Sequence, residues 1–144
     1  LWDLYCGVGG FALAAARAGF PRVTGVEVSS GAISSAISAA RHAGLSRSAA
    51  SFIADDATAW ARAQSPEDIP DVIVVNPPRR GIGADLAAYL NNCDAPRVIY
   101  SSCNPASLAT DLAAMPTLRP VEGRLFDMFP HTTHAEVALL LERA

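Results

Sequence analysis

Short apolar, β-branched runs alternate with alanine-rich helical patterns along most of this chain, and this alternation constrains the fold more than any other feature. It predicts strands at 1–5, 23–28, 51–54, 71–75 and 97–101, and helices at 11–18, from Ser29 or Ser30 to Gly44, at 57–63, 85–90 and 105–113. Strands that alternate with helices form parallel sheets joined by right-handed crossovers. The Val and Ile run within 71–75 is typical of a central strand covered on both faces.

The last part of the chain breaks this alternation. Two strands are expected at 123–129 and 135–141 with no helix between them, so we expect them to pair antiparallel. The sequence thus predicts an α/β fold with a mostly parallel, seven-stranded sheet and an antiparallel last strand. Ligands of such sheets bind beyond the carboxyl ends of the strands, where each polar motif described below is expected.

Size and composition fit one domain. The chain has 144 residues, of which 51% are hydrophobic and 17% charged, a balance that argues against disorder. The sequence contains neither an apolar run of membrane-spanning length nor a secretory signal. Because it opens inside an apolar run, we expect residues 1–144 to be one domain of a longer protein whose upstream part is missing.

The net charge and the cysteine content limit which binding partners and which cellular compartment are plausible. The net charge is −3, so affinity for a polyanion would have to come from local arginines or from absent sequence. Cys6, Cys93 and Cys103 show neither zinc-site spacing nor a disulfide framework. We therefore expect a reducing, cytoplasmic location.

A glycine-rich turn follows the first predicted strand. Residues 7–12 (Gly-Val-Gly-Gly-Phe-Ala) fit G-x-G-x-x-A, in which Gly7 and Gly9 allow a tight turn and close approach of the backbone to a ligand. Glu27 ends the second strand, 18 residues after Gly9, where a carboxylate can accept both hydroxyls of a ribose. The pair predicts a cofactor that contains a nucleoside.

Two more residues extend this predicted cofactor site, each with an alternative. Asp56 follows the third strand and is either a partner for an adenine amino group or the N-cap of the next helix, and the two roles can coexist. Tyr5 either contacts the cofactor or fills the core.

A stiff polar loop follows the fourth predicted strand. Residues 76–83 read Asn-Pro-Pro-Arg-Arg-Gly-Ile-Gly, and the two prolines restrict the backbone. A fixed loop suits a site that holds a planar base against a methyl donor, whereas the alternative is a rigid connection with solvated arginines. Amino-group methyltransferases also use Asn-Pro-Pro, but an aromatic residue normally follows, and here Arg79 stands in that place.

Cys103 is the candidate nucleophile. It follows the fifth strand directly before a helix for which Asn104 is a suitable N-cap and Pro105 a suitable first residue. A helix N-terminus favours negative charge, so a thiolate is stabilised there. Cys6 and Cys93 lack this position, and we expect them to be small buried hydrophobic residues.

Glu136 is the candidate proton acceptor. It opens the last predicted strand, at the end of the segment 127–136 (Asp-Met-Phe-Pro-His-Thr-Thr-His-Ala-Glu). A carboxylate at the start of an apolar strand points to a chemical role. The spacing of His131 and His134 is weak support for metal binding, and no metal site is predicted.

These motifs together resemble the RNA uracil-5 methyltransferase family, and within it the bacterial 23S rRNA branch. The resemblance rests on residues 3–10, 76–81, 101–104 and 127–132, whose order and spacing match over nearly the whole chain. It implies a Rossmann-like class I methyltransferase fold and S-adenosylmethionine as cofactor. It also implies RNA, specifically 23S rRNA, as partner, rather than DNA or a membrane.

The resemblance also implies residue roles. Glu27 would bind the ribose, Asp56 would lie near adenine, Tyr5 and Gly7 would border the methionine part, and Asn76 would contact the cofactor or the target base. Many relatives carry Asp in place of Asn76, and an asparagine keeps only the hydrogen-bonding role. Relatives also have an upstream region, often with an iron–sulfur cluster, which this chain lacks.

The chemistry accounts for these residues independently. Carbon 5 of uracil is a poor nucleophile until the Cys103 thiolate adds to carbon 6 and forms an enolate. Carbon 5 then takes the sulfonium methyl, Glu136 removes the carbon-5 proton, and elimination frees Cys103. The base must first leave its stack. Arg79, Arg80 and Arg124 either hold flanking phosphates or are solvated.

Other functions stay open from the residues alone. Another adenosylmethionine-dependent methyltransferase, acting on an amino group or a small molecule, would keep Glu27 without needing Cys103. A nicotinamide-dependent dehydrogenase would share the glycine turn, but the expected antiparallel closing pair disfavours it. A catalytically silent RNA-binding remnant conflicts with the acidic net charge.

Overall fold

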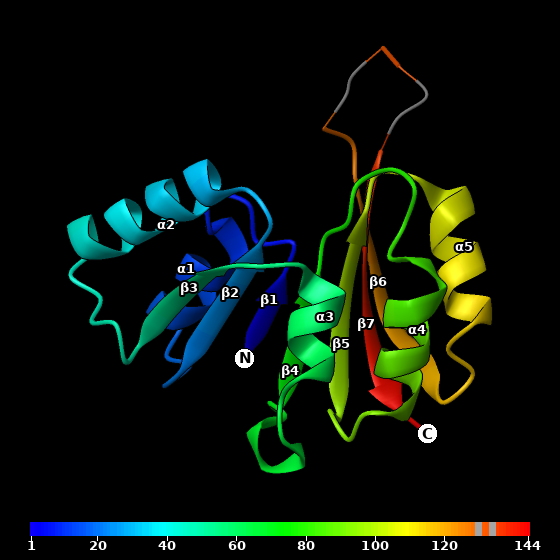
Figure 1. The fold of residues 1–144 in the computed structure, drawn as a ribbon. Coiled ribbons are helices and arrows are strands. Elements are labelled where there is room, and N and C mark those ends of the chain that lie inside the picture. The colour runs from blue at the N-terminus through cyan, green and yellow to red at the C-terminus, as the bar shows by residue number, and fades with distance from the viewer. Residues whose placement is uncertain (129–130, 133–134) are drawn as a thin grey trace. The chain divides into compact units, whose positions relative to one another are not determined.

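The computed structural model describes residues 1–128, 131–132 and 135–144 (Figure 1). Phe129, Pro130, Thr133 and His134, which belong to the predicted 127–136 motif, lie outside the described residues. The chain divides into two compact units, Leu1–Gln64 and Ser65–Ala144, and each is described by itself. None of the described helices is both long and apolar enough to cross a membrane.

The first unit is built on three parallel strands. Its elements are β1 (Trp2–Leu4), α1 (Gly10–Arg17), β2 (Val23–Glu27), α2 (Ser30–His42), β3 (Ala50–Ala54) and α3 (Ala57–Arg62). Strand β2 pairs in parallel with both β1 and β3. Ile33, Ala36 and Ala40 of α2 are buried, and the Ser29 side chain caps this helix by accepting from the Ala32 N–H at 3.3 Å.

The second unit contains the remaining strands. After a short 3₁₀ turn (Pro66–Asp68) come β4 (Val72–Val75), α4 (Gly83–Asn92), β5 (Arg97–Ser102), α5 (Pro105–Ala113), β6 (Leu118–Phe126) and β7 (Glu136–Arg143). Strand β4 is parallel to β5, while β7 lies between β5 and β6 and is antiparallel to both. All four β4 residues are buried, as the prediction of a central strand requires.

The predicted strand and helix order is confirmed, but several boundaries differ: α4 is longer at both ends than the predicted 85–90, and β6 ends at Phe126 rather than at 129. Strand β6 begins at Leu118 rather than at 123, although the strand then includes Pro120. Proline lacks a backbone donor and is tolerated mainly on edge strands and at bulges. In the described part of the chain β6 pairs with β7 alone, and its register shifts between Pro120 and Glu122. The edge position therefore accommodates a residue that the sequence pattern treats as a strand breaker.

Candidate functional site

The glycine turn in the first unit is shaped by two left-handed residues. Gly7 and Gly9 have φ angles of +53° and +89°. A Cβ at Gly9 would lie 2.9 Å from Cε1 of Phe52, so both the dihedral angle and the contact require glycine there. A Cβ at Gly7 would meet nothing within 4 Å, so this side of the turn faces open space. The turn therefore leaves room for a ligand at Gly7.

Asp3 ties β1 to the first turn of α1, next to the glycine turn, and no sequence motif indicates this role. It is fully buried at the centre of β1, and its Oδ2 accepts from the Ala12 N–H in the first turn of α1 at 2.9 Å. Its Oδ1 has no hydrogen-bond partner among the described residues. Burial raises the pKa of Asp3 to about 7, and this effect exceeds the lowering by the Ala12 hydrogen bond.

Cys6 and Cys93 are buried, each with 7% of its surface exposed, which confirms the prediction for both. Burial, followed by the charges of Asp3 and Glu27, raises the pKa of Cys6 to about 12. Burial also raises the pKa of Cys93. Both side chains therefore stay protonated thiols near neutral pH, and neither is a candidate nucleophile.

Glu27 sits at the end of β2, beside the glycine turn. Its Oε2 accepts from the Gly7 N–H at 3.3 Å and its Oε1 accepts from the Ser29 N–H at 3.0 Å. These two bonds fix the carboxylate in place. Because each carboxylate oxygen can accept two hydrogen bonds, both oxygens keep capacity for a hydroxyl donor.

Asp56 and Tyr5 lie near the same strand ends. Glu27 pairs with Ala54 in the β2–β3 register. Asp56 comes two residues after Ala54, so it lies just beyond the end of β3, near the end of β2 where Glu27 stands. The Asp56 Oδ1 caps α3 by accepting from the Ala59 N–H at 2.8 Å, so the N-cap alternative is observed. Tyr5 is half-buried, with a φ of +69°, in the turn that leaves β1.

In the second unit, the register of β5 against β7 brings Cys103 and Glu136 to the same point. The antiparallel ladder ends with Ser102 opposite Val137. Cys103 is the next residue of one chain segment and Glu136 the next of the other, so they follow as neighbours beyond the last pair. Cys103 is half-buried, unlike the other two cysteines.

Ser101 holds the predicted base, Glu136, and no sequence pattern indicates this contact. Its hydroxyl donates to the Glu136 Oε1 at 2.5 Å. Ser101 is buried, whereas Glu136 is half-buried. Ser101 lies two residues before Cys103, so this bond holds the Glu136 carboxylate at the end of the strand that Cys103 follows.

The loop 76–83 is tied to the start of α5. Asn104 caps α5 by accepting from the Ala106 N–H at 3.2 Å, and its Nδ2 donates to the Arg79 carbonyl at 2.8 Å. The predicted cap is therefore confirmed, and one side chain links the Asn-Pro-Pro-Arg loop to the residue after Cys103. Asn76 is exposed at the end of β4, one residue past Val75, whose partner in β5 is Tyr100.

Asp111 makes a second link between α5 and this loop, and no sequence motif drew attention to it. It is 6% exposed, and its Oδ2 accepts from the Ile82 N–H at 2.9 Å and from the Tyr100 hydroxyl at 2.5 Å. A Cβ at Gly81, whose φ is +86°, would collide with the Asp111 carboxyl group. The buried carboxylate therefore fixes the loop, β5 and α5 relative to one another.

Each unit thus holds one set of candidate functional groups. The first unit presents a fixed carboxylate beside a glycine turn with open space, an arrangement that can hold a nucleoside. The second unit presents a half-buried thiol directly before the N-cap of α5, and a carboxylate that lies beyond the same end of the β5–β7 ladder. A thiol and a carboxylate placed in this way can perform nucleophilic addition and proton removal.

Two family profiles match the chain. The tRNA (uracil-5-)-methyltransferase profile covers residues 67–144, which include the loop 76–83, Cys103 and Glu136. The RNA cap guanine-N2 methyltransferase profile covers residues 1–92 and ends before β5. The second match thus covers the glycine turn and Glu27 but neither of the residues predicted to act on uracil.

Curated relatives match over the full length of the chain. A 23S rRNA (uracil(747)-C(5))-methyltransferase of Pectobacterium atrosepticum is 46% identical over 100% of this chain. The chain spans 37% of that relative's length. A putative enzyme of the same name from Haemophilus ducreyi is 46% identical over 99% of this chain, which covers 68% of that protein.

Solved structures share the fold. The tRNA (uracil-54, C5)-methyltransferase of Pyrococcus abyssi, in complex with S-adenosyl-L-homocysteine, is 32% identical. It aligns with a TM-score of 0.84 over 97% of this chain and 33% of that one. A putative adenosylmethionine-dependent methyltransferase from Streptococcus mutans, 11% identical with a TM-score of 0.81 over 98% of this chain and 43% of its own, supports the fold alone. The predicted Rossmann-like methyltransferase fold is confirmed.

Proposed function

This chain belongs to the tRNA (uracil-5-)-methyltransferase family, and from this premise we propose that it methylates carbon 5 of a uridine in RNA with S-adenosylmethionine as donor. The curated relatives are named for 23S rRNA, so we propose 23S rRNA as the substrate and the cytoplasm as the location. The observation that carries the proposal is the convergence of Cys103 and Glu136 where the β5–β7 ladder ends.

The first unit fits the cofactor. Glu27 keeps one free acceptor position on each oxygen after its bonds to the Gly7 and Ser29 N–H groups, which matches the two hydroxyls of a ribose. Gly7 offers open space for close approach, while Gly9 shapes the turn. We assign Asp56 to adenine, Tyr5 to the methionine part, and Asn76 to the cofactor or the base. When bound, the cofactor supplies an electrophilic methyl group.

Cys103 starts the chemistry on uracil. Its thiolate forms a bond to carbon 6, and the electron pair of the 5,6 double bond moves into an enolate. Carbon 5 thereby becomes nucleophilic enough to accept the methyl group. Cys103 precedes Asn104, the N-cap of α5, so its sulfur lies at the N-terminal end of that helix.

Glu136 completes the reaction. Its carboxylate accepts the proton from carbon 5, and the electron pair of that C–H bond re-forms the double bond as the Cys103 sulfur leaves carbon 6. The Ser101 hydroxyl, which donates to Glu136 Oε1, holds the carboxylate in one orientation for this step. Asn104 and Asp111 fix the neighbouring loop 76–83, which we propose faces the flipped base.

The match to the guanine-N2 family supports a second candidate, methylation of an amino group. Such an enzyme needs the glycine turn, Glu27 and the Asn-Pro-Pro loop, but no covalent step. The two functions therefore differ in whether Cys103 forms an adduct, and an adduct experiment separates them.

The test uses RNA that carries 5-fluorouridine. Fluorine cannot leave carbon 5 as a proton does, so methyl transfer should stall with the RNA covalently joined to Cys103, visible as a protein–RNA band on a denaturing gel. The adduct should require S-adenosylmethionine, disappear in Cys103→Ala and persist in the control Cys93→Ala. A missing adduct with wild-type protein, or one unaffected by Cys103→Ala, would refute the covalent mechanism.

A companion variant tests the base. Glu136→Gln should still form the adduct with ordinary RNA and S-adenosylmethionine, because addition and methyl transfer precede proton removal. Turnover should then stall, so the methylated RNA should accumulate in covalent form. Normal multiple turnover by this variant would exclude Glu136 as the base.

A further inference from the structure

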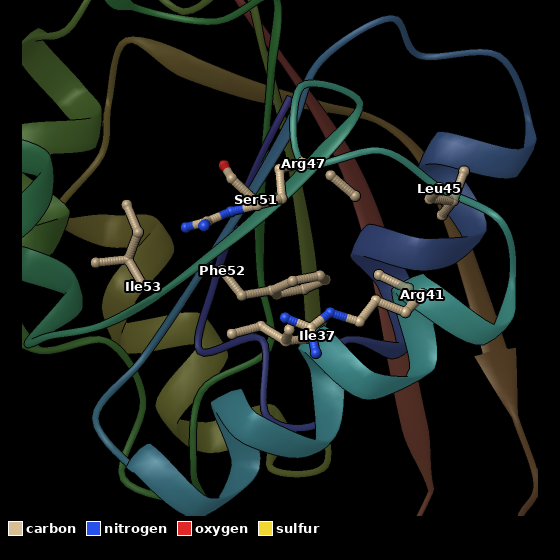
Figure 2. Close-up of a pocket in the computed structure, with 9 residues that line it drawn as sticks. Ile37, Arg41, Leu45, Arg47, Ser51, Phe52 and Ile53 are labelled. Carbon is tan, nitrogen blue, oxygen red and sulfur yellow. The ribbon is translucent and has the colours of Figure 1, made fainter.

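A cavity of about 210 Å³ lies in the first unit between α2 and β3, and we call it the α2–β3 pocket. None of the residues assigned above to the cofactor or to the chemistry lines it. Figure 2 shows its walls, and the lining residues come from the C-terminal half of α2, the following loop and β3: Ile37, Ala40, Arg41, Leu45, Arg47, Ala50, Ser51, Phe52 and Ile53.

The aromatic wall of this pocket is held in place. Phe52 packs directly on the backbone of Gly9 and Gly25, where a Cβ atom would approach the ring to 2.9 Å and 2.7 Å respectively. A ring fixed in this way loses little freedom when a ligand stacks on it. Phe52 is therefore a preformed platform rather than a mobile side chain.

Two cations border that platform. In Figure 2 the Arg41 and Arg47 side chains reach in on opposite sides of Phe52. Within the part of the chain that the structure describes, neither guanidinium has a hydrogen bond or an ion pair. Residues 28–54 contain Arg41, His42 and Arg47 but no Asp or Glu. Although the whole chain has a net charge of −3, the segment 28–54 is locally positive. Its surface is therefore suited to binding an anion.

We propose that the α2–β3 pocket binds one unpaired nucleotide of the RNA, with its base on Phe52 and its phosphate between Arg41 and Arg47. The inference rests on the proposed RNA substrate and adds a second contact point outside the reacting site. The planar face of a base can stack on an aromatic ring, and the oxygens of a phosphodiester can accept hydrogen bonds from the N–H groups of a guanidinium. A free inorganic anion would use the arginines but not the apolar wall.

The site should contribute to affinity without contributing to chemistry. Phosphate contacts raise binding and its salt dependence, while the reacting groups Cys103 and Glu136 lie in the second unit. The pocket should therefore lower the KM for RNA and leave kcat and the affinity for the cofactor unchanged.

The test compares an Arg41→Ala, Arg47→Ala double variant with a control, Arg17→Ala, Arg22→Ala. The control removes two exposed arginines of the same unit that do not line the pocket. Binding of a 23S rRNA fragment that contains uridine 747, the position named for the relatives, is measured by fluorescence anisotropy across salt concentrations. We expect the pocket variant to bind RNA about 10-fold more weakly. The slope of the logarithm of the binding constant against the logarithm of the salt concentration should become shallower by about 1 for each phosphate that an arginine no longer neutralises.

Phe52→Leu tests the base-stacking part separately. It should weaken RNA binding without changing the salt slope, because stacking involves no counterion release. The Arg41→Ala, Arg47→Ala variant, which leaves Phe52 and the glycine turn intact, should keep wild-type affinity for S-adenosylhomocysteine and wild-type kcat at saturating RNA. Equal RNA affinity of the pocket variant and the control, or an equal loss of cofactor affinity, would overturn the proposal. Absence of RNA methylation by the wild-type protein would instead refute the proposed function, and the binding comparison would still decide on the pocket.

Discussion

At the scale of single residues, surroundings assign opposite roles to identical side chains. Cys6, Cys93 and Cys103 are all free thiols, yet burial raises the pKa of the first two, and only Cys103 is partly exposed at a helix N-terminus. The carboxylates divide similarly. Asp3 is fully buried under the glycine turn, whereas Glu27 and Glu136 are half-buried where ligands could reach them. Burial thus separates structural groups from candidate reactive ones.

Asp3 predicts a pH dependence of stability. Its pKa of about 7 in the folded chain exceeds the ordinary value of 3.8, so between these values the folded state holds a proton that the unfolded state has lost. The free energy of unfolding should therefore fall by about 2–4 kcal/mol as the pH rises from about 4 to about 7, and then level off. Asp3→Asn cannot ionise and should flatten this curve, while its side-chain oxygen can still accept from the Ala12 N–H.

Urea denaturation followed by tryptophan fluorescence measures this effect. Both tryptophans of the chain, Trp2 and Trp60, lie in the first unit and pack edge to face with ring centroids 4.9 Å apart, so the signal reports the unit that contains Asp3. Asp55→Asn, at an exposed carboxylate of the same unit, serves as the control and should behave like wild type. A wild-type curve as flat as that of Asp3→Asn would contradict the prediction.

At the scale of elements, α5 organises the predicted catalytic half. Its N-cap, Asn104, holds the Arg79 carbonyl, and Asp111, two turns later, holds the Ile82 N–H and the Tyr100 hydroxyl. One helix therefore positions the loop 76–83 and the end of β5 together. The stiffness of the loop comes from these bonds as well as from its two prolines.

Asp111→Ala should loosen this arrangement. It removes the acceptor of the buried Ile82 N–H and of one Tyr100 hydrogen bond, at a cost of about 1–3 kcal/mol in stability. Methyl transfer at saturating substrates should slow by about 10- to 100-fold because the loop loses its fixed position. The affinity for S-adenosylhomocysteine should change little, since Glu27 and the glycine turn belong to the first unit.

Two further variants make this prediction specific to position. Asp111→Asn keeps one oxygen that can accept both bonds and should restore most of the activity. Thr110→Ala alters the exposed neighbour on the same helix and should leave the rate near wild type. If Asp111→Asn were as slow as Asp111→Ala while both folded normally, positioning through these hydrogen bonds would be the wrong explanation.

At the scale of the whole molecule, the residues proposed to bind the cofactor nucleoside and those proposed to act on uracil belong to different units. The residues assigned to the nucleoside of the cofactor lie within Leu1–Gln64, and the nucleophile and base lie within Ser65–Ala144. A ligand that binds only the folded state protects the segments that it touches from local opening. Cofactor binding should therefore leave a local trace in amide hydrogen exchange.

S-adenosylhomocysteine should slow exchange at 7–10, at 27–29, near Asp56 and next to Asn76, and leave the edge strand β6 unchanged. NAD, added as a control at the same concentration, should have no effect, because the proposed site is built for adenosylmethionine and the family is not a dehydrogenase family. Equal protection by NAD would favour the nicotinamide alternative. Protection confined to the second unit would refute the assignment of Glu27.

The sequence by itself determined the order and type of the elements and the positions of the motifs at strand ends. Helix α5 runs from Pro105 to Ala113 as predicted, because a cap residue and a following proline act over a few residues. Local periodicity and capping depend on near neighbours along the chain, and a sequence shows these directly.

Only the tertiary structure decided which distant residues serve each motif. Ser101 contacts Glu136 across 35 residues, Asp111 contacts Ile82 across 29, and Phe52 of β3 packs on Gly9 in the turn before α1. Strand β6 likewise tolerates Pro120 only because β6 lies at an edge of its sheet. Such contacts depend on strand register and on the crossing of elements, which leave no periodic pattern near either residue, so no local reading of the chain reveals them.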